Sequence, residues 1–328
     1  MRSAYVLLLA ANLVYATSYV VTRVVLGDLP PAFLALVRLV VGAAILVPIA
    51  RVLEPPVETS NKWGAPIWPP TPPERSAASR QSRGAPRRRD SFTGPARSDA
   101  WRIAWMGVVG FAGAFALSHW GLARSTATNA ALLIIVEPLS IMALSPLLLG
   151  ERLRRREVAG GALALLGAVL VVLNGVPGLT LALAPHWRGD LLLVLAGLAY
   201  GAYTLIGRAV LARHSPLVVT ARSIVWGAVV MVPLAAVEWL GGARPMLSPG
   251  AVMGALYLAV VITAFGYLLW NWVLARVSAP QVAIFVTVQP IGGAVLGVVL
   301  LGEPLTVFTV AGAVLIVLGL WLTVTGRN

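Results

Sequence analysis

The chain has 328 residues, of which 59% are hydrophobic and only 11% are charged, and its mean hydropathy is +0.86. A soluble domain cannot keep that much apolar surface away from water, so the composition excludes a soluble globular protein and predicts one that lies in a lipid bilayer. The chain has no cysteine and only three scattered histidines. This excludes disulfides, thiolate chemistry and the ligand spacing of a metal site, and we expect no cofactor.

The net charge of +13 is a second constraint on the class of protein. Basic chains often bind nucleic acid, but here the positive residues are distributed as in a membrane protein. If the amino terminus lies in the cytoplasm, 19 of the 25 Lys and Arg residues fall in inner loops or at inner span ends. This positive-inside bias predicts a plasma (inner) membrane protein with both termini cytoplasmic, and nucleic acid is not expected as a partner.

Apolar segments of about 20 residues, the length that crosses a hydrocarbon core of roughly 30 Å, recur along the chain. The first five lie near residues 4–25, 31–52, 102–121, 127–148 and 157–174. Five more lie near residues 190–211, 217–239, 249–272, 279–300 and 306–325. The chain is therefore expected to cross the membrane ten times, with helices as the spanning elements.

The first segment also has the charged start and the apolar run of a signal peptide. Its residues nevertheless return later at a constant offset of 185: Tyr15, Arg23 and Pro31 recur as Tyr200, Arg208 and Pro216. A removable leader has no reason to share a pattern with the sixth apolar segment. We therefore expect this segment to be the first span of a repeated unit.

The later part of each unit repeats as well. Residues 119–167 align without a gap on residues 271–319, at a constant offset of 152. Each unit holds five spans, and an odd number forces the second copy to enter the bilayer in the opposite direction. The predicted fold is an all-α polytopic membrane protein with ten transmembrane helices, arranged as two inverted five-helix repeats at residues 1–180 and 185–328.

Residues 53–101 form the one large insertion in the first repeat, and they are rich in Pro, Ser and Arg. Such a composition buries too little apolar surface to offset the entropy of ordering, so we expect a disordered cytoplasmic loop. Its basic cluster Arg87–Arg89 could contact anionic lipid head groups. The alternative is a solvated linker that only sets the topology.

Glu137 is the only carboxylate deep inside a span. It lies about 15 Å along the fourth span, at 1.5 Å per residue, and therefore near the bilayer midplane, where an ionised acid costs at least about 2.5 kcal/mol. Pro138 follows Glu137, and Gln289 is the equivalent of Glu137 in the second copy. One interpretation is a site at which Glu137 exchanges a proton or accepts a substrate amine, while Gln289 supplies neutral hydrogen bonds. The other is a protonated Glu137 with a structural role.

Further polar residues lie within the first span of each copy: Asn12 and Tyr15 in the first copy, Tyr200 and Tyr203 in the second. Their polar groups could line a cavity. Tyrosine in a span can equally pack with its hydroxyl group bonded to a neighbouring helix. Both interpretations stay open at this point.

His119-Trp120 ends the third span, and Asn271-Trp272 ends the eighth. Trp at a span end is usually an anchor at the membrane interface, which is the favoured interpretation for both Trp residues. His119 could protonate at a gate or could only satisfy a hydrogen bond. Arg38 and Arg222 lie a few residues inside the second and seventh spans, and we expect them to reach the nearby interface rather than a substrate carboxylate.

Two pairs of motifs stand in symmetric positions: IVEPLS with GERL in the first copy, and TVQPIG with GEPL in the second. With ten spans, these motifs resemble the EamA-type exporters of the drug/metabolite transporter superfamily. The resemblance implies an inner-membrane carrier, commonly an exporter of amino acids or related metabolites, whose cavity is lined by helices one, three, four, six, eight and nine. It places six of the polar residues on lining helices: Tyr15, His119, Glu137, Tyr200, Asn271 and Gln289.

The sequence therefore predicts a secondary carrier that works by alternating access, with a small-molecule substrate held near the midplane between the two copies. Proton coupling through Glu137 is part of this hypothesis. The expected substrate-binding residues are Glu137, Gln289, Tyr15, Tyr200, His119, Asn271, Asn12, Tyr203, Trp120 and Trp272. The chain has no P-loop, HExxH, GxSxG or dinucleotide motif, so an enzyme is not expected. The alternatives are a multidrug or lipophilic-cation exporter and a non-transporting membrane scaffold or sensor.

Because the chain has no cysteine, single cysteines can report the topology directly. Arg152 and Pro304 are equivalent residues in the GERL and GEPL turns. In intact cells, a membrane-impermeant maleimide should label the Pro304→Cys variant at once and the Arg152→Cys variant only after permeabilisation. Labelling of both variants from the same side would contradict the inverted repeat.

Overall fold

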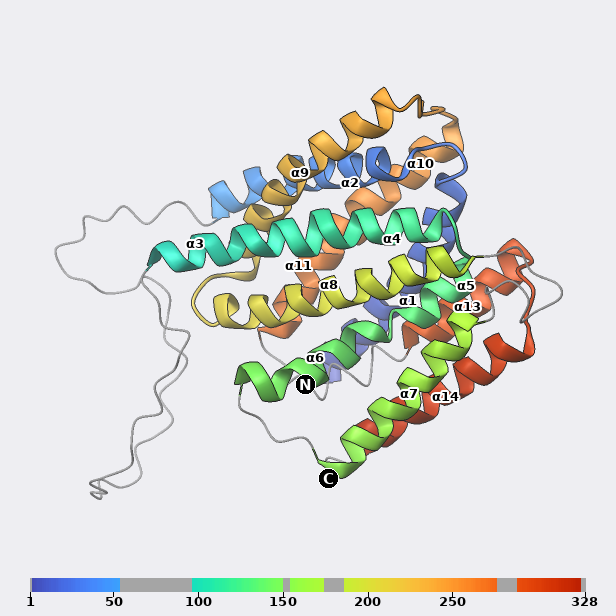
Figure 1. Ribbon diagram of the computed structural model, residues 1–328. Helices are drawn as coiled ribbons and strands as arrows, with labels where there is room; N and C mark the ends of the chain where they lie inside the picture. The colour runs from blue at the N-terminus through green and yellow to red at the C-terminus, as the bar shows by residue number, and fades with distance from the viewer. Residues whose placement is uncertain (1, 54–95, 150–153, 174–185, 276–287, 326–328) are drawn as a thin grey trace, which may run out of the picture.

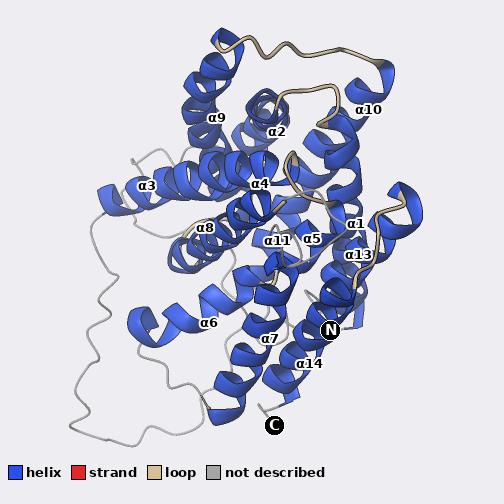
Figure 2. Ribbon diagram, turned by 45° about the vertical axis from the view of Figure 1, so that its right-hand side comes forward, coloured by secondary structure: helices blue, strands red, loops and turns tan. Residues whose placement is uncertain are grey.

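A computed structural model describes residues 2–53, 96–149, 154–173, 186–275 and 288–325. Within these ranges every regular element is a helix (Figures 1 and 2), so the predicted all-α class is confirmed. The first repeat contains α1 (Arg2–Val25), α2 (Pro31–Leu53), α3 (Ala96–Trp105), η1 (Met106–Gly113), α4 (Ala114–Leu122), α5 (Ala127–Leu133), α6 (Val136–Leu149) and α7 (Arg155–Leu173). The second contains α8 (Trp187–Leu211), α9 (Pro216–Leu240), α10 (Pro249–Tyr257), η2 (Leu258–Gly266), α11 (Tyr267–Leu274), α13 (Val288–Leu301) and α14 (Val307–Thr325).

Three sequence predictions fall outside the described residues. They are the disorder of the loop between α2 and α3 with its Arg87–Arg89 cluster, the position of the GERL turn, and the boundary between the repeats near residue 180. These three stay predictions.

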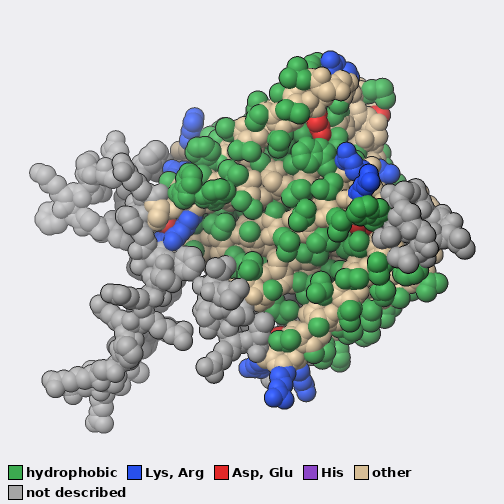
Figure 3. All heavy atoms as spheres, in the orientation of Figure 1, with side chains coloured by type: hydrophobic (Ala, Val, Ile, Leu, Met, Phe, Trp, Pro, Cys, Tyr) green, Lys and Arg blue, Asp and Glu red, His purple; other side chains and the backbone are tan. Residues whose placement is uncertain are grey.

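Seven helical stretches are long and apolar enough to cross a membrane. With α1, α13 and α14 they account for the ten predicted passes. Large apolar side chains on these helices face outward, including Val229, Leu256 and Val299. In Figure 3 hydrophobic side chains cover the middle of the visible face, while Lys and Arg gather at its edges. This distribution is typical of a multi-pass membrane protein, in which lipid surrounds the hydrophobic middle of the molecule.

Short polar side chains start several of the helices. The Thr126 hydroxyl accepts from a backbone N–H in the first turn of α5, and Ser215 and Ser248 do the same for α9 and α10. Pro216 and Pro249 then occupy the first helical position, where proline loses no hydrogen bond. The connections before α5 and α9 are short, because each of these helices begins at such a signal soon after the preceding helix ends.

Contacts between the repeats are reciprocal. Helix α1 packs on α13, while its equivalent α8 packs on α6, the equivalent of α13. Likewise α2 packs on η2, and α9 packs on η1. Each element therefore contacts the opposite copy in the way its counterpart does, as expected for two repeats related by a pseudo-two-fold axis. The prediction of two inverted five-helix repeats agrees with this packing.

Helices α7 and α14 lie side by side at one edge of the bundle (Figures 1 and 2). Glycines form the closest points of their contact. A Cβ atom on Gly167 would lie 2.6 Å from the Gly312 carbonyl oxygen, and one on Gly319 would lie 2.5 Å from the Gly160 carbonyl oxygen. At the offset of 152, Gly167 is equivalent to Gly319 and Gly160 is equivalent to Gly312. The two contacts are therefore the same close backbone approach, repeated across the pseudo-two-fold axis. Small residues permit such contacts between membrane helices.

The third and eighth spans each contain a π-helical segment, η1 and η2, at equivalent positions. Nothing in the sequence predicted them. π-helical turns are rare and occur mostly at functional sites. Here η2 supplies Ile262 to the internal cavity described below.

The glycine contact predicts the effect of one added methyl group. The Gly167→Ala substitution should destabilise the protein by about 1–3 kcal/mol, because backbone atoms of α14 cannot give way as a side chain can. The matched control is Gly250→Ala, because nothing lies within 4 Å of a Cβ atom built there. Thermal unfolding in detergent should show a lower Tm for the first variant only. Equal Tm values would contradict this packing.

Candidate functional site

The cavity lies between the two repeats and has a volume of about 120 Å³. This volume is somewhat below the roughly 150 Å³ of a cavity that holds a benzene molecule, so the cavity as it stands suits only a small solute. Elements of both copies line it: α1, α2, α4, α5 and α6 from the first, and α8, η2, α11 and α13 from the second. The resemblance had not included the second span, which the structure adds through Arg38.

Glu137 lies on the cavity wall directly after a break in the fourth span. Pro138 has no N–H, and the Glu137 N–H donates to the Ile134 carbonyl at 3.0 Å, one residue closer than in an α-helix. The carboxylate thus occupies the first turn of α6, where the helix dipole favours a negative charge. Its side-chain donor is the Thr204 hydroxyl at 3.1 Å, and no described cation lies within 4 Å of it.

Glycines of α8 allow this break to lie against the opposite copy. A Cβ atom on Gly197 would lie 2.8 Å from the Val136 Cβ, and one on Gly201 would lie 1.8 Å from the Ser140 hydroxyl. Backbone of α8 therefore touches the start of α6 without an intervening side chain. The close approach holds Glu137 at the interface between the repeats.

Gln289, the equivalent of Glu137, also lines the cavity. Its amide group donates to the Asn12 side-chain oxygen at 2.7 Å, and its own oxygen accepts from the Tyr19 hydroxyl at 3.3 Å. Asn12 is buried behind Gln289 and does not line the cavity. The two symmetry-related positions therefore carry one acid and one neutral amide at the same cavity.

Arg38 is the main departure from the sequence prediction. The expectation that it reaches the membrane interface is wrong: only 6% of the residue is exposed, and it lines the cavity. Its Nε donates to the Thr263 hydroxyl at 3.0 Å, and its Nη1 lies 2.9 Å from His119 Nε2. Arg222, in contrast, is exposed, and its reach to the interface stays a prediction.

Aromatic side chains form much of the remaining wall. Tyr15, Tyr200 and Tyr203 line the cavity, as does Tyr267, which the sequence did not single out. Ring centroids of Tyr15 and Tyr267 lie 6.5 Å apart in an edge-to-face arrangement. Asn271 is buried behind this wall, where it donates to the Tyr203 hydroxyl at 2.8 Å.

The two end-of-span tryptophans do not line the cavity. Trp120 is partly buried, and its indole N–H donates to the Glu238 carboxylate near the end of α9. Trp272 is partly buried in α11. Of the ten predicted binding residues, six line the cavity: Tyr15, His119, Glu137, Tyr200, Tyr203 and Gln289.

Carboxylates join the repeats at the end of the bundle that carries the α4–α5 and α13–α14 connections. The Glu303 carboxylate of the second copy accepts from the Ala127 and Thr128 N–H groups at 2.7 Å each, which caps α5 of the first copy. Glu238 accepts from the Ala32 N–H at the start of α2 at 2.8 Å. A carboxylate at a helix N-terminus satisfies free N–H donors and complements the dipole. We call this end the carboxylate end.

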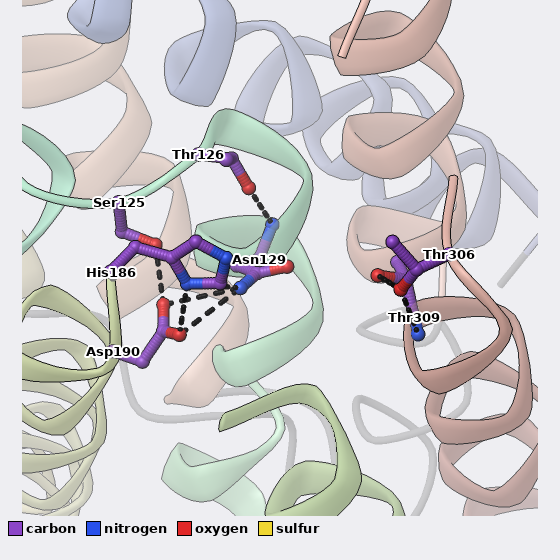
Figure 4. A network of polar contacts seen from close by, with 7 residues as sticks. All are labelled: Ser125, Thr126, Asn129, His186, Asp190, Thr306 and Thr309. Carbon is purple, nitrogen blue, oxygen red and sulfur yellow. Dashed lines mark hydrogen bonds and ion pairs between the residues drawn. The ribbon is translucent and has the colours of Figure 1, made fainter. Parts of the chain in front are cut away.

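Asp190 completes the carboxylate end (Figure 4). It is fully buried at the start of α8, and its carboxylate accepts from the Ser125 hydroxyl, the Asn129 amide at 3.1 Å and the His186 Nδ1 at 2.8 Å. Ser125 and Asn129 belong to the first copy. Sequence reasoning missed this network, because the two segments are far apart in the chain.

A membrane-embedded bundle of two inverted repeats around one shared cavity defines a membrane carrier. The chain belongs to the EamA-like transporter family, which it matches over residues 2–72, 80–173 and 187–325. The predicted membership of the drug/metabolite transporter superfamily is thereby confirmed.

Relatives with described names agree with this membership. An uncharacterized transporter of Archaeoglobus fulgidus is 28% identical over 71% of this chain and 79% of its own. A probable amino-acid metabolite efflux pump of Salmonella typhimurium is 29% identical over 60% of this chain and 67% of its own. A probable terminal-alkyne amino-acid exporter of Streptantibioticus cattleyicolor is 27% identical, over 70% and 74%. A protein of known crystal structure shares the fold, with a TM-score of 0.62 over 98% of this chain and 96% of that one, at 19% identity.

The Glu303 cap predicts a measurable contribution to stability. The Glu303→Ala substitution leaves the Ala127 and Thr128 N–H groups without their carboxylate and should cost about 1–2 kcal/mol. Glu303→Gln keeps one acceptor oxygen and should cost less. Thermal unfolding in detergent measures both, and a Glu303→Ala protein as stable as wild type would contradict the cap.

Proposed function

We propose that this protein is a secondary exporter of amino acids or related small metabolites, located in the plasma (inner) membrane with both termini in the cytoplasm. The observation that carries the proposal is the shared cavity, because residues of both repeats line it and Glu137 brings a carboxylate into it. The names of the relatives in Salmonella and Streptantibioticus support the substrate class. The positive-inside distribution supports the orientation.

Export of this kind needs a cavity that opens to each side in turn. Glu303, Glu238 and Asp190 hold the carboxylate end together through contacts between the copies. In the proposed orientation this end faces outward, so these contacts separate when the outer side opens. Glu303 and Glu238 are partly exposed, so water can replace their hydrogen bonds, whereas the fully buried Asp190 becomes hydrated only when this end opens.

Glu137 is the proposed coupling residue. One buried carboxylate can hold either a proton or a substrate ammonium group, and its burial makes the unpaired anion costly. The two ligands therefore compete for it. Binding of a proton from outside displaces the ammonium group, so that proton entry and substrate exit become linked.

The proposed function predicts the behaviour of a Glu137→Gln variant in proteoliposomes. Gln keeps the volume and can still accept from Thr204, but it holds no exchangeable charge. Transport of labelled amino acids by wild type should respond to an imposed pH gradient, and the variant should lose that response while it remains folded. Gradient-driven uptake should fall by about tenfold or more, the effect of losing one charged hydrogen bond.

Glu157→Gln is the matched control, because Glu157 is buried at the start of α7 and lies outside the cavity. It should keep the gradient response. An unchanged response in the Glu137→Gln variant would remove proton coupling through this residue. Absence of any amino-acid flux in wild type would overturn the substrate class.

A further inference from the structure

Arg38 brings a second charge into the cavity, and its guanidinium group is only partly occupied by protein. Of its five N–H donors, one from Nε goes to Thr263 and one from Nη1 goes to His119. One face of the group stacks on the Phe115 ring, 4.4 Å from the ring centroid. The remaining edge, with Nη2, has no hydrogen-bond partner among the described residues, and Arg38 lines the cavity.

The hydrogen bonds of His119 show that it is not a second cation here. Its Nδ1 lies 3.1 Å from the Pro31 carbonyl oxygen, which can only accept. Nδ1 therefore carries the proton, and Nε2 is the acceptor for the Arg38 guanidinium. A protonated ring would set an N–H against an N–H at 2.9 Å. His119 thus orients Arg38 as a neutral partner.

Arg38 consequently has no counter-ion in the described part of the protein. The described ion pairs all lie elsewhere. Thr263, His119 and the Phe115 face are neutral, and they offset the burial of the charge only in part. An uncompensated buried charge costs several kcal/mol, whereas a carboxylate bound by the free edge of the guanidinium would balance it with two parallel hydrogen bonds.

We propose that Arg38 binds the carboxylate of the transported substrate, so that the substrate is a solute with both a carboxylate and an ammonium group, such as an α-amino acid. This inference rests on the proposed function and adds the group that recognises the acid end. Arg38 and Glu137 are the two charged side chains of the cavity lining, and they are not paired with one another. A substrate that carries both charges neutralises both residues at once.

The repeat makes the assignment more specific. At the offset of 185, the position equivalent to Arg38 is Ser223, which is buried and donates to a backbone carbonyl of its own helix. At the offset of 152, the equivalent of Glu137 is Gln289. Both charges therefore come from the first copy. The same positive charge repels a lipophilic cation, which counts against the multidrug alternative.

The test uses the full chain in proteoliposomes and measures uptake of labelled L-leucine, L-threonine and L-phenylalanine. Each is challenged with two unlabelled analogues: its amide, which lacks the carboxylate, and its deaminated acid, which lacks the ammonium group. Wild type should prefer the amino acid to either analogue by about tenfold or more, as expected when a charged hydrogen-bonded contact is lost.

Two substitutions should then separate the two contacts. Arg38→Gln should bring the amino acid and its amide to within about twofold of one another, because a neutral side chain no longer distinguishes a carboxylate from an amide. It should keep the preference over the deaminated acid. Glu137→Gln should do the reverse. Arg222→Gln is the matched control, an exposed arginine on α9, and should behave as wild type.

An Arg38→Gln variant that still rejects the amide would overturn the role of Arg38 and leave the proposed function intact. Wild-type protein that takes up none of the three amino acids would overturn both. If Arg38→Gln does not fold, Arg38→Lys decides the matter, because it keeps the charge and loses the planar fork. Arg38→Lys should discriminate less strongly against the amide, and unchanged discrimination would count against the inference.

Discussion

In the hydrocarbon core no water can satisfy a free backbone N–H or C=O group, so a spanning chain can leave the α-helical pattern only where protein or a polar cavity surrounds it. The break between α5 and α6 follows from this constraint, because it precedes Glu137, which lines the cavity. The π-helical segments η1 and η2 keep their backbone hydrogen bonds within the helix. Thus η2 exposes Phe265 on one side while it contributes Ile262 to the same cavity on the other. The constraint places the broken backbone where the substrate is proposed to bind.

A second property of lipid explains the glycines at the contacts between repeats. Helices in lipid gain no hydrophobic energy by associating. Van der Waals contact between closely packed backbones must therefore stabilise their association. Gly167 of α7 packs closely on Gly312 of α14. Gly197 and Gly201 of α8 allow α8 to pack closely on α6 beside Glu137. The first pair holds two helices that contribute no residue to the cavity lining. The second pair brings the acid against the opposite copy. One packing device therefore serves both the scaffold and the site.

The fold could be predicted from the sequence because its signals are linear. Span length follows from hydropathy, orientation follows from the odd number of spans, and the repeat appears as a constant offset. Glu137 could be found for the same reason, since its depth is counted along one helix. The break between α5 and α6, in contrast, became apparent only in the structure.

Arg38 could not be predicted in this way, because its environment comes from other spans. Counting along α2 gives its depth but not the direction in which its side chain points. His119 of α4 and Thr263 of η2 decide that direction, and Thr263 lies in a π-helical segment that the sequence does not reveal. The Asp190 network and Tyr267 were missed for the same reason. Partners from distant segments cannot be inferred from one sequence without an alignment.

The unequal distribution of charge has a consequence for the transport cycle. Two inverted repeats can exchange conformations between the inward and outward states, so the backbone around the cavity is approximately equivalent in both. The charges do not exchange, because Arg38 and Glu137 both belong to the first copy, while Ser223 and Gln289 stand at the equivalent positions. A substrate held by both charges would keep its contacts with the first repeat in either state. The second repeat, with neutral groups at those positions, could then move past the bound substrate without separating an ion pair in the membrane interior.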